Sequence, residues 1–170
     1  MKSLHPLLLL PLTAIAAQAY TLELELGKNH PTGRQSSSVV GLTLATQVNE
    51  NFGVGLNLNS RGLEGGTPAI NLKARTALTE VTYDLNSAGG IRPFVGAGVG
   101  YAWLSGTGSD SKTVLATNAF AGVRFALSES LDLAFTVKNH HFMGVKGAVG
   151  TTTKNTISDW SQSVSLRLKF

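Results

Sequence analysis

Polar and apolar residues alternate over most of this 170-residue chain. Residues 163–170 read Ser-Val-Ser-Leu-Arg-Leu-Lys-Phe, and residues 20–26 read Tyr-Thr-Leu-Glu-Leu-Glu-Leu. Successive side chains of a β-strand point to opposite faces, so a period of two predicts strands with one apolar and one polar face. We expect eight strands, at residues 20–28, 38–48, 52–60, 69–84, 91–104, 112–127, 130–141 and 159–170.

The connections between these segments alternate in length. Short ones fall at residues 49–51, 85–90 and 128–130, and longer ones, rich in Gly, Ser, Thr or Asn, at 29–37, 61–68, 105–111 and 142–158. Transmembrane barrels have an even number of antiparallel strands, short periplasmic turns and longer extracellular loops. The pattern therefore predicts an all-β fold, an eight-stranded antiparallel up-and-down transmembrane β-barrel.

The residues on each face indicate which one points outward. One face is rich in Leu and Val, and the other in small residues, which suit the narrow interior of an eight-stranded barrel. Aromatic residues near the strand ends match the girdles at the two membrane interfaces. The alternative is a secreted lipocalin-like barrel, which has the same period with its apolar face inside. The expected girdle residues are Tyr20, Phe52, Tyr83, Phe94, Phe125 and Phe170 at the short-turn end, and Tyr101, Trp103, Phe142 and Trp160 at the other.

The first residues predict export. Lys2 precedes an apolar run over residues 7–17, and Ala17-Gln18-Ala19 is a small-x-small cleavage site. We interpret residues 1–19 as a cleaved signal peptide and 20–170 as the barrel. The chain has no cysteine, which excludes disulfides and thiol chemistry. Charged residues make up 14% of it, against about 25% in soluble domains, and form no basic cluster that would bind nucleic acid.

A family resemblance lies in three stretches. Residues 92–101, Arg-Pro-Phe-Val-Gly-Ala-Gly-Val-Gly-Tyr, resemble the fifth-strand signature of small outer-membrane β-barrel proteins, which include the OmpA transmembrane domain and the opacity and NspA-type surface proteins. Residues 120–133 are similar to the next hairpin of that family. The chain end resembles its assembly signal, here Leu166, Leu168 and Phe170, read by the barrel-assembly machinery. The resemblance implies a monomer in the cell outer membrane, in contact with outer-membrane lipid and lipopolysaccharide.

Long charged residues lie on the polar face and are expected to form a network in the lumen. Because unpaired buried charge is costly, each needs a partner. Counting in twos from Lys73 and Arg75 places Glu80 on the lipid face. The network either plugs the barrel or, with loosely solvated charges, lines a small pore. Its expected members are Glu23, Glu25, Lys73, Arg75, Arg124, Asp132, Lys138 and Arg167.

Two pairings within this network are expected. Arg124 and Asp132 flank the tight turn at 128–130, so they lie at nearly opposite positions of adjacent strands. Barrel closure places the first strand beside the last, so Glu23 or Glu25 is expected to meet Arg167.

Some barrels of this size act on lipid A, and lipid A deacylase of the outer-membrane type carries a His, a Ser two residues later and a downstream acid. His140 and His141 lie near the end of a predicted strand, but Phe142 and Met143 stand two residues after them, so the nucleophile is missing. We interpret both histidines as rim-exposed. Adjacent strand residues point to opposite faces and cannot easily share an ion, so no catalytic, cofactor or metal site is assigned.

The sequence favours a non-enzymatic outer-membrane barrel with a structural or surface-interaction role. Three alternatives stay open. One is an adhesin or ligand-binding protein that acts through the loops at 29–37 and 142–158, although these contain few apolar anchors. The second is a small-solute channel, and the third is a lipid A-modifying enzyme.

Overall fold

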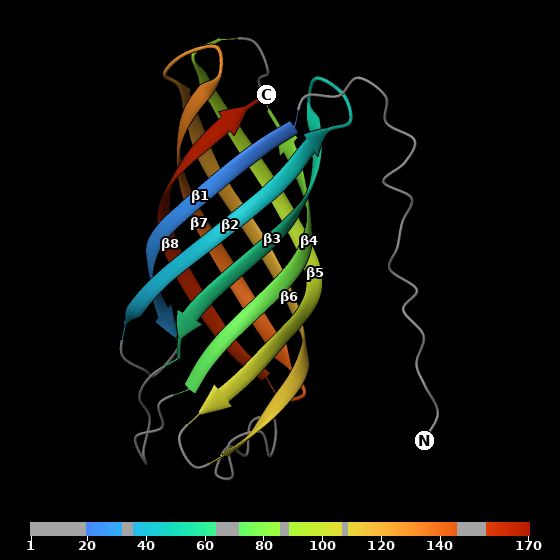
Figure 1. Ribbon diagram of the computed structural model, residues 1–170, viewed down its shortest axis with the longest axis vertical. Helices are drawn as coiled ribbons and strands as arrows, with labels where there is room; N and C mark the ends of the chain where they lie inside the picture. Colours follow the sequence, from blue (N-terminus) through green and yellow to red (C-terminus); the bar gives the residue numbers. More distant parts are fainter. Residues whose placement is uncertain (1–19, 32–35, 64–71, 86–88, 107–108, 146–155) are drawn as a thin grey trace.

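The chain folds into a closed sheet of eight antiparallel strands. The computed structural model describes residues 20–31, 36–63, 72–85, 89–106, 109–145 and 156–170, so the expected signal peptide lies outside the described residues. The strands follow one another around the barrel in sequence order (Figure 1). They are β1 (Tyr20–Pro31), β2 (Ser37–Gln47), β3 (Phe52–Gly62), β4 (Leu72–Asp84), β5 (Ile91–Gly106), β6 (Ser109–Ala126), β7 (Leu131–Met143) and β8 (Thr156–Lys169).

The predicted strands are confirmed. Each observed strand begins and ends within three residues of its predicted segment. β1, β3, β5 and β7 run in one direction and the other four run back, so the three short turns share one end of the barrel (Figure 1). We call this end the short-turn end and the opposite one the loop end.

The sheet closes along the seam between β1 and β8. Leu24 lies opposite Leu166 in this pair. The N–H of Tyr20 donates to the carbonyl of Phe170 at 2.9 Å, and the N–H of Phe170 donates back at 3.0 Å. Pairing therefore continues to the last residue of the chain. Such closure leaves no edge of unpaired backbone groups, which is the condition for a sheet to cross lipid.

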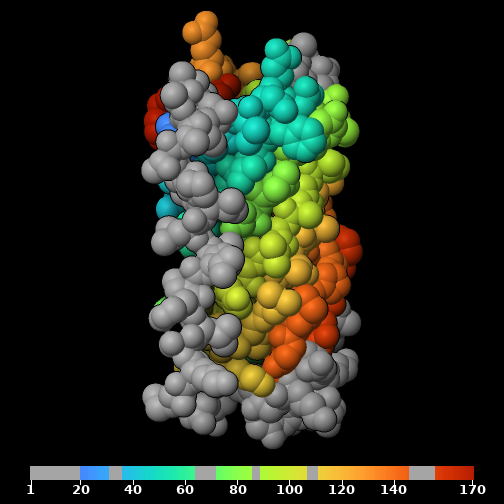
Figure 2. Space-filling model, turned by 90° about the vertical axis from the view of Figure 1, so that its right-hand side faces the viewer, coloured from blue at the N-terminus to red at the C-terminus, as the bar shows by residue number. Residues whose placement is uncertain are grey.

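Along the strands, many leucines are exposed and many charged residues are buried, which is the reverse of the arrangement in a soluble protein. Leu24 and Leu26 are 56% and 64% exposed, whereas Glu25 between them is 2% exposed. On β8 the side chain of Leu166 is exposed, and that of Arg167 is buried. A lipocalin-like barrel would bury the leucines, so the apolar face points outward as predicted. The strands cross this outer surface as diagonal bands in the space-filling view (Figure 2).

The aromatic girdles are confirmed for most predicted members. Tyr20, Phe52, Tyr83 and Phe170 are exposed near the short-turn end, and Tyr101, Trp103 and Trp160 near the loop end. The prediction is wrong for two residues. Phe94 and Phe142 are 3% and 0% exposed and point inward. Each is adjacent in sequence to an outward residue and therefore points into the barrel. Their rings fill interior space that small residues alone would leave open.

Glycines make room for the inward rings. A Cβ added at Gly96 would overlap the ring of Phe120, and a Cβ added at Gly122 would overlap the ring of Phe94. The glycines of β5 and β6 are therefore packing residues of a filled interior, which explains their presence in strands they would otherwise weaken.

Candidate functional site inside the barrel

Apolar side chains fill the lumen near the loop end. They come from β4, β5, β6, β7 and β8 and from the residues that follow β3 and β7. Phe142, Leu72 and Leu104 are each at most 1% exposed. The cluster comprises Leu63, Leu72, Ala74, Leu78, Ala102, Leu104, Val114, Ala116, Phe142, Val145 and Ile157. Water and ions cross such an apolar cluster only at a high desolvation cost.

A buried arginine lies among polar groups next to this apolar layer. Arg61, at the end of β3, is 1% exposed, and its Nη1 donates to Asp159 Oδ2 of β8 at 2.8 Å. Its Nε and Nη2 donate to Asn59 Oδ1 at 3.1 and 3.0 Å. Asn29 Nδ2 donates to the same Asp159 oxygen at 3.3 Å. The imidazole of His140 completes the group, with its Nδ1 2.9 Å from Arg61 Nη1.

A second ion-pair group surrounds Lys138 of β7. Its Nζ donates to Glu25 Oε2 of β1 at 3.0 Å and lies 3.6 Å from Glu80 Oε1 of β4. Asn118 Nδ2 of β6 donates to that Glu80 oxygen at 2.6 Å. The ammonium also lies 5.3 Å from the centroid of the Phe120 ring, within cation–π range. This group crosses the lumen, because β1, β4 and β7 are not neighbours in the sheet.

A third group lies nearer the short-turn end. Arg124 forms an ion pair with Asp84 of β4, and its guanidinium carbon lies 3.9 Å from the centroid of the Phe94 ring. Asp132 is fully buried and pairs with two cations. Arg92 Nη2 lies 2.5 Å from its Oδ2, and Lys169 Nζ donates to its Oδ1 at 3.0 Å.

The two predicted pairings are not the ones observed. Arg124 reaches across the lumen to β4 and does not pair with Asp132. Glu25 pairs with Lys138. Glu23 does lie directly opposite Arg167 in the β1–β8 register, but its Oε1 accepts a hydrogen bond from Ser165 Oγ at 2.6 Å. These expectations considered only side chains on neighbouring strands. In a narrow barrel, a long side chain can also reach a partner across the lumen.

The structure corrects the predicted network on β4. Lys73 and Arg75 are exposed on the outer surface, so their assignment to the lumen is wrong, whereas Glu80, expected on the lipid face, is 5% exposed inside. Lys73 and Arg75 occupy the loop end of the strand, where an outward cation meets headgroups and not hydrocarbon. The interior receives the other predicted members, with Glu23 half-buried beside a small cavity.

Besides Glu80 and Arg92, four titratable residues of the interior were missed by the sequence reasoning. Arg61 was placed in a loop because the third strand was expected to end at residue 60. Asp84 and Asp159 were not assigned to the lumen, although the period of two places both there. His140, interpreted as rim-exposed, is 0% exposed, and counting in twos from Lys138 would have placed it inside.

A small cavity remains inside the barrel. A cavity of ≈ 30 Å³ lies toward the short-turn end, with Glu23, Arg124 and Arg167 in its wall. Since one water needs at least about 10–15 Å³ of such volume, the cavity has room for about two waters.

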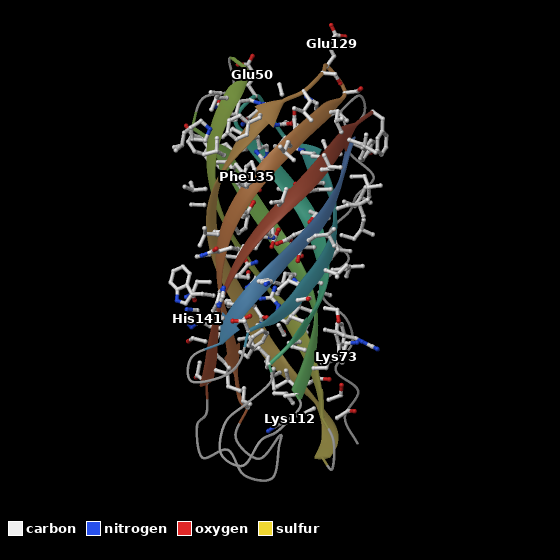
Figure 3. The ribbon with its side chains drawn as sticks, turned by 90° about the vertical axis from the view of Figure 1, so that its left-hand side faces the viewer. Glu50, Lys73, Lys112, Glu129, Phe135 and His141 are labelled. Atoms are coloured by element: carbon white, nitrogen blue, oxygen red, sulfur yellow. The ribbon has the colours of Figure 1, made fainter. Side chains whose placement is uncertain are left out.

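Among the described side chains, two exposed contacts join a histidine and a serine, and the first lies between His30 Nδ1 and Ser36 Oγ at 2.8 Å. The second involves His141 of β7. His141 is exposed, and its Nδ1 lies 2.9 Å from Ser158 Oγ of the neighbouring strand. The sequence reasoning sought this serine two residues along the same strand and so missed it. The exposed carboxylates among the described side chains, Glu50 and Glu129, lie at the other end of the barrel (Figure 3). Within the described residues no three His, Cys, Asp or Glu side chains are grouped to bind a metal ion.

No helix among the described residues is long and apolar enough to span a membrane. The outer membrane protein beta-barrel domain family matches residues 4–170. The chain therefore belongs to this family of outer-membrane barrels. It resides in the outer membrane, within its lipid and lipopolysaccharide.

Solved structures of outer-membrane barrels share the fold. The chain is similar to neisserial surface protein A (NspA), with a TM-score of 0.71 and 16% identity over 90% of this chain and 97% of that one. The outer membrane protein OprG from Pseudomonas aeruginosa gives 0.60 and 14%, over 91% and 96%. The outer membrane enzyme PagL gives 0.58 and 18%, over 85% and 97%. No curated protein sequence matches the chain.

Proposed function

We propose that this chain is a non-enzymatic, monomeric barrel with a structural role in the outer membrane, closed to solutes by its own interior. The observation that carries the proposal is the filled lumen, which holds an apolar cluster at the loop end, the Arg61 group beside it and two further ion-pair groups nearer the short-turn end. Desolvated charges of this kind persist only when they are paired, so the ion pairs favour a plug over a wet pore. Sheet closure leaves no edge that would require a partner subunit.

Conductance across a planar lipid bilayer tests the closed lumen. The purified wild-type barrel is expected to give no regular current steps. A variant combining Arg61→Ser and Phe142→Ala, which removes the bulk of two layers, is expected to admit ions. Phe135→Ala, which shortens an outward aromatic of the same strand as Phe142, is its matched control and should stay silent. Reproducible steps from the wild-type protein would replace the structural role with a small-solute channel.

Assembly through the chain end is part of the same proposal. Leu166 and Leu168 point outward, and Phe170, the last residue paired with β1, is 72% exposed. An exposed apolar strand end with a terminal aromatic is accessible to the barrel-assembly machinery before the seam with β1 closes. The role of these three residues as an assembly signal is an expectation carried by the family resemblance.

Lipid hydrolysis is the second candidate, because His141 and Ser158 form a base and hydroxyl pair on the outer surface. A serine hydrolase also needs a group that orients its base, and the described carboxylates near the loop end point into the barrel. We therefore expect purified lipid A to keep its mass after incubation with the protein. Loss of an acyl chain that disappears in Ser158→Ala would establish the enzyme in place of the structural role.

A further inference from the structure

Exposed charges are separated between the two ends of the barrel. Among the described side chains, the exposed acids Glu50 and Glu129 belong to short turns, whereas the exposed cations Lys28, Lys73 and Arg75 lie at the loop end. Figure 3 shows Glu50 and Glu129 at one end and Lys73 toward the other. The loop end of a transmembrane barrel faces outward, so these cations lie at the level of the outer-leaflet headgroups.

Two of these cations line one hollow, made of two adjoining parts, on the outside of the barrel from β1 to β6. The part nearer the loop end, ≈ 440 Å³, has Ser38, Ser60 and Lys73 in its wall. The part nearer the middle of the barrel, ≈ 780 Å³, has Arg75, Trp103 and four leucines in its wall, the outward Leu24, Leu42 and Leu58 and the buried Leu104. The parts adjoin, since Val40 and Ser60 line both.

In the strand register, the groups that can bind a lipid headgroup lie on the loop-end side of a row of apolar side chains that can contact an acyl chain. Across the sheet, Ser60 lies opposite Arg75, and Arg75 opposite Trp103. The next outward row toward the short-turn end is apolar: Leu24, Leu42, Leu58, Ala77, Tyr101 and Leu115. A guanidinium, an ammonium and serine hydroxyls are the groups that bind phosphate.

We propose that this hollow binds an anionic, phosphate-bearing lipid of the outer leaflet. Its phosphate lies between Arg75 and Lys73, with Ser38 and Ser60 as additional donors, and an acyl chain lies along Leu58 and Leu42. The occupant is a lipid and not free phosphate, because the hollow has an apolar surface beside the cations. A free anion would leave that surface uncovered, whereas an acyl chain covers it. The inference rests on the membrane orientation of the barrel and is independent of its structural role.

Quenching of tryptophan by brominated lipids tests this site. The chain has two tryptophans, so Trp160→Phe leaves Trp103 as the sole reporter beside Arg75. This full-length protein, folded in phosphatidylcholine vesicles, is titrated with brominated phosphatidic acid or brominated phosphatidylcholine. Trp103 should prefer phosphatidic acid, and each of Arg75→Gln and Lys73→Gln should weaken that preference about fivefold. Lys28→Gln is the matched control, since Lys28 lies at the same end but outside this hollow, and should leave the preference unchanged.

Two results would overturn the proposal. One is that Trp103 still prefers brominated phosphatidic acid in the variant that combines Arg75→Gln and Lys73→Gln. The other is an equal loss in Lys28→Gln, which would show a diffuse surface potential and no site. A gel shift on heating confirms that each variant is folded. In case the paired variant does not fold, Ser60→Glu, which places a carboxylate beside Arg75, must abolish the preference in the same assay. Neither result depends on whether the barrel conducts.

Discussion

Lys138 holds two carboxylates together in the lumen, and its removal tests whether this interior is dry. Lys138→Met keeps the length of the side chain and removes its charge. Lys138, Glu25 and Glu80 are each at most 5% exposed, and the ammonium lies 3.0 and 3.6 Å from the two carboxylates. Without it, two buried carboxylates face each other unpaired. Removing one partner of a buried ion pair costs about 3–5 kcal/mol, and we expect a loss in that range.

Urea unfolding of the barrel in lipid vesicles, followed by the heat-modifiable gel shift, measures this loss. The outward Lys73→Met is the matched control and should change the free energy of unfolding by less than about 1 kcal/mol. Adding Glu25→Gln and Glu80→Gln to Lys138→Met should recover most of the stability, since the carboxylates are then neutral. Wild-type stability of Lys138→Met alone would refute the reasoning, because it would mean that water already solvates these carboxylates.

Three further predictions concern the lipid face, the packing of the interior and the chain end. Val137→Arg, on the outer face at the middle of β7, should cost about 2–4 kcal/mol in urea unfolding; an unchanged midpoint would contradict its outward placement. Gly96→Val should reduce the folded fraction because its side chain overlaps Phe120, whereas Ala97→Val on the outer face should fold normally; equal yields would argue against a filled interior. Deletion of Phe170 should slow assembly in cells, measured by pulse-labelling, while refolding in vitro persists; unaltered assembly would remove its role as a signal.

The strands and their outward face could be predicted because each rests on a repeated local pattern. Leu22, Leu24 and Leu26 each indicate the same outward face, and the same alternation occurs again in the final segment. The seam between β1 and β8 then follows from the even strand count, since closure pairs the first strand with the last.

The interior was less predictable, because a charge was taken as evidence of an inward side chain. On β4 this rule fails: Lys73 and Arg75 are outward at the loop end, and Glu80 is inward. Counting back from the outward Val81 and Tyr83 gives the correct phase. Which charges pair also depends on distances across the lumen. The ion pair between Arg124 and Asp84 joins strands that are not neighbours, and no local spacing encodes it.

The central claim is that the outward leucines and valines of the alternating pattern face lipid, while ion pairs, small residues and an apolar cluster fill the interior. Spin labels at single cysteines along residues 163–168 test it most directly, since the chain has no cysteine of its own. The account predicts that oxygen, which partitions into lipid, reaches labels at 164, 166 and 168, and that labels at 163, 165 and 167 are inaccessible. The opposite phase, or access of a water-soluble nickel complex to positions 164 and 166, would contradict it.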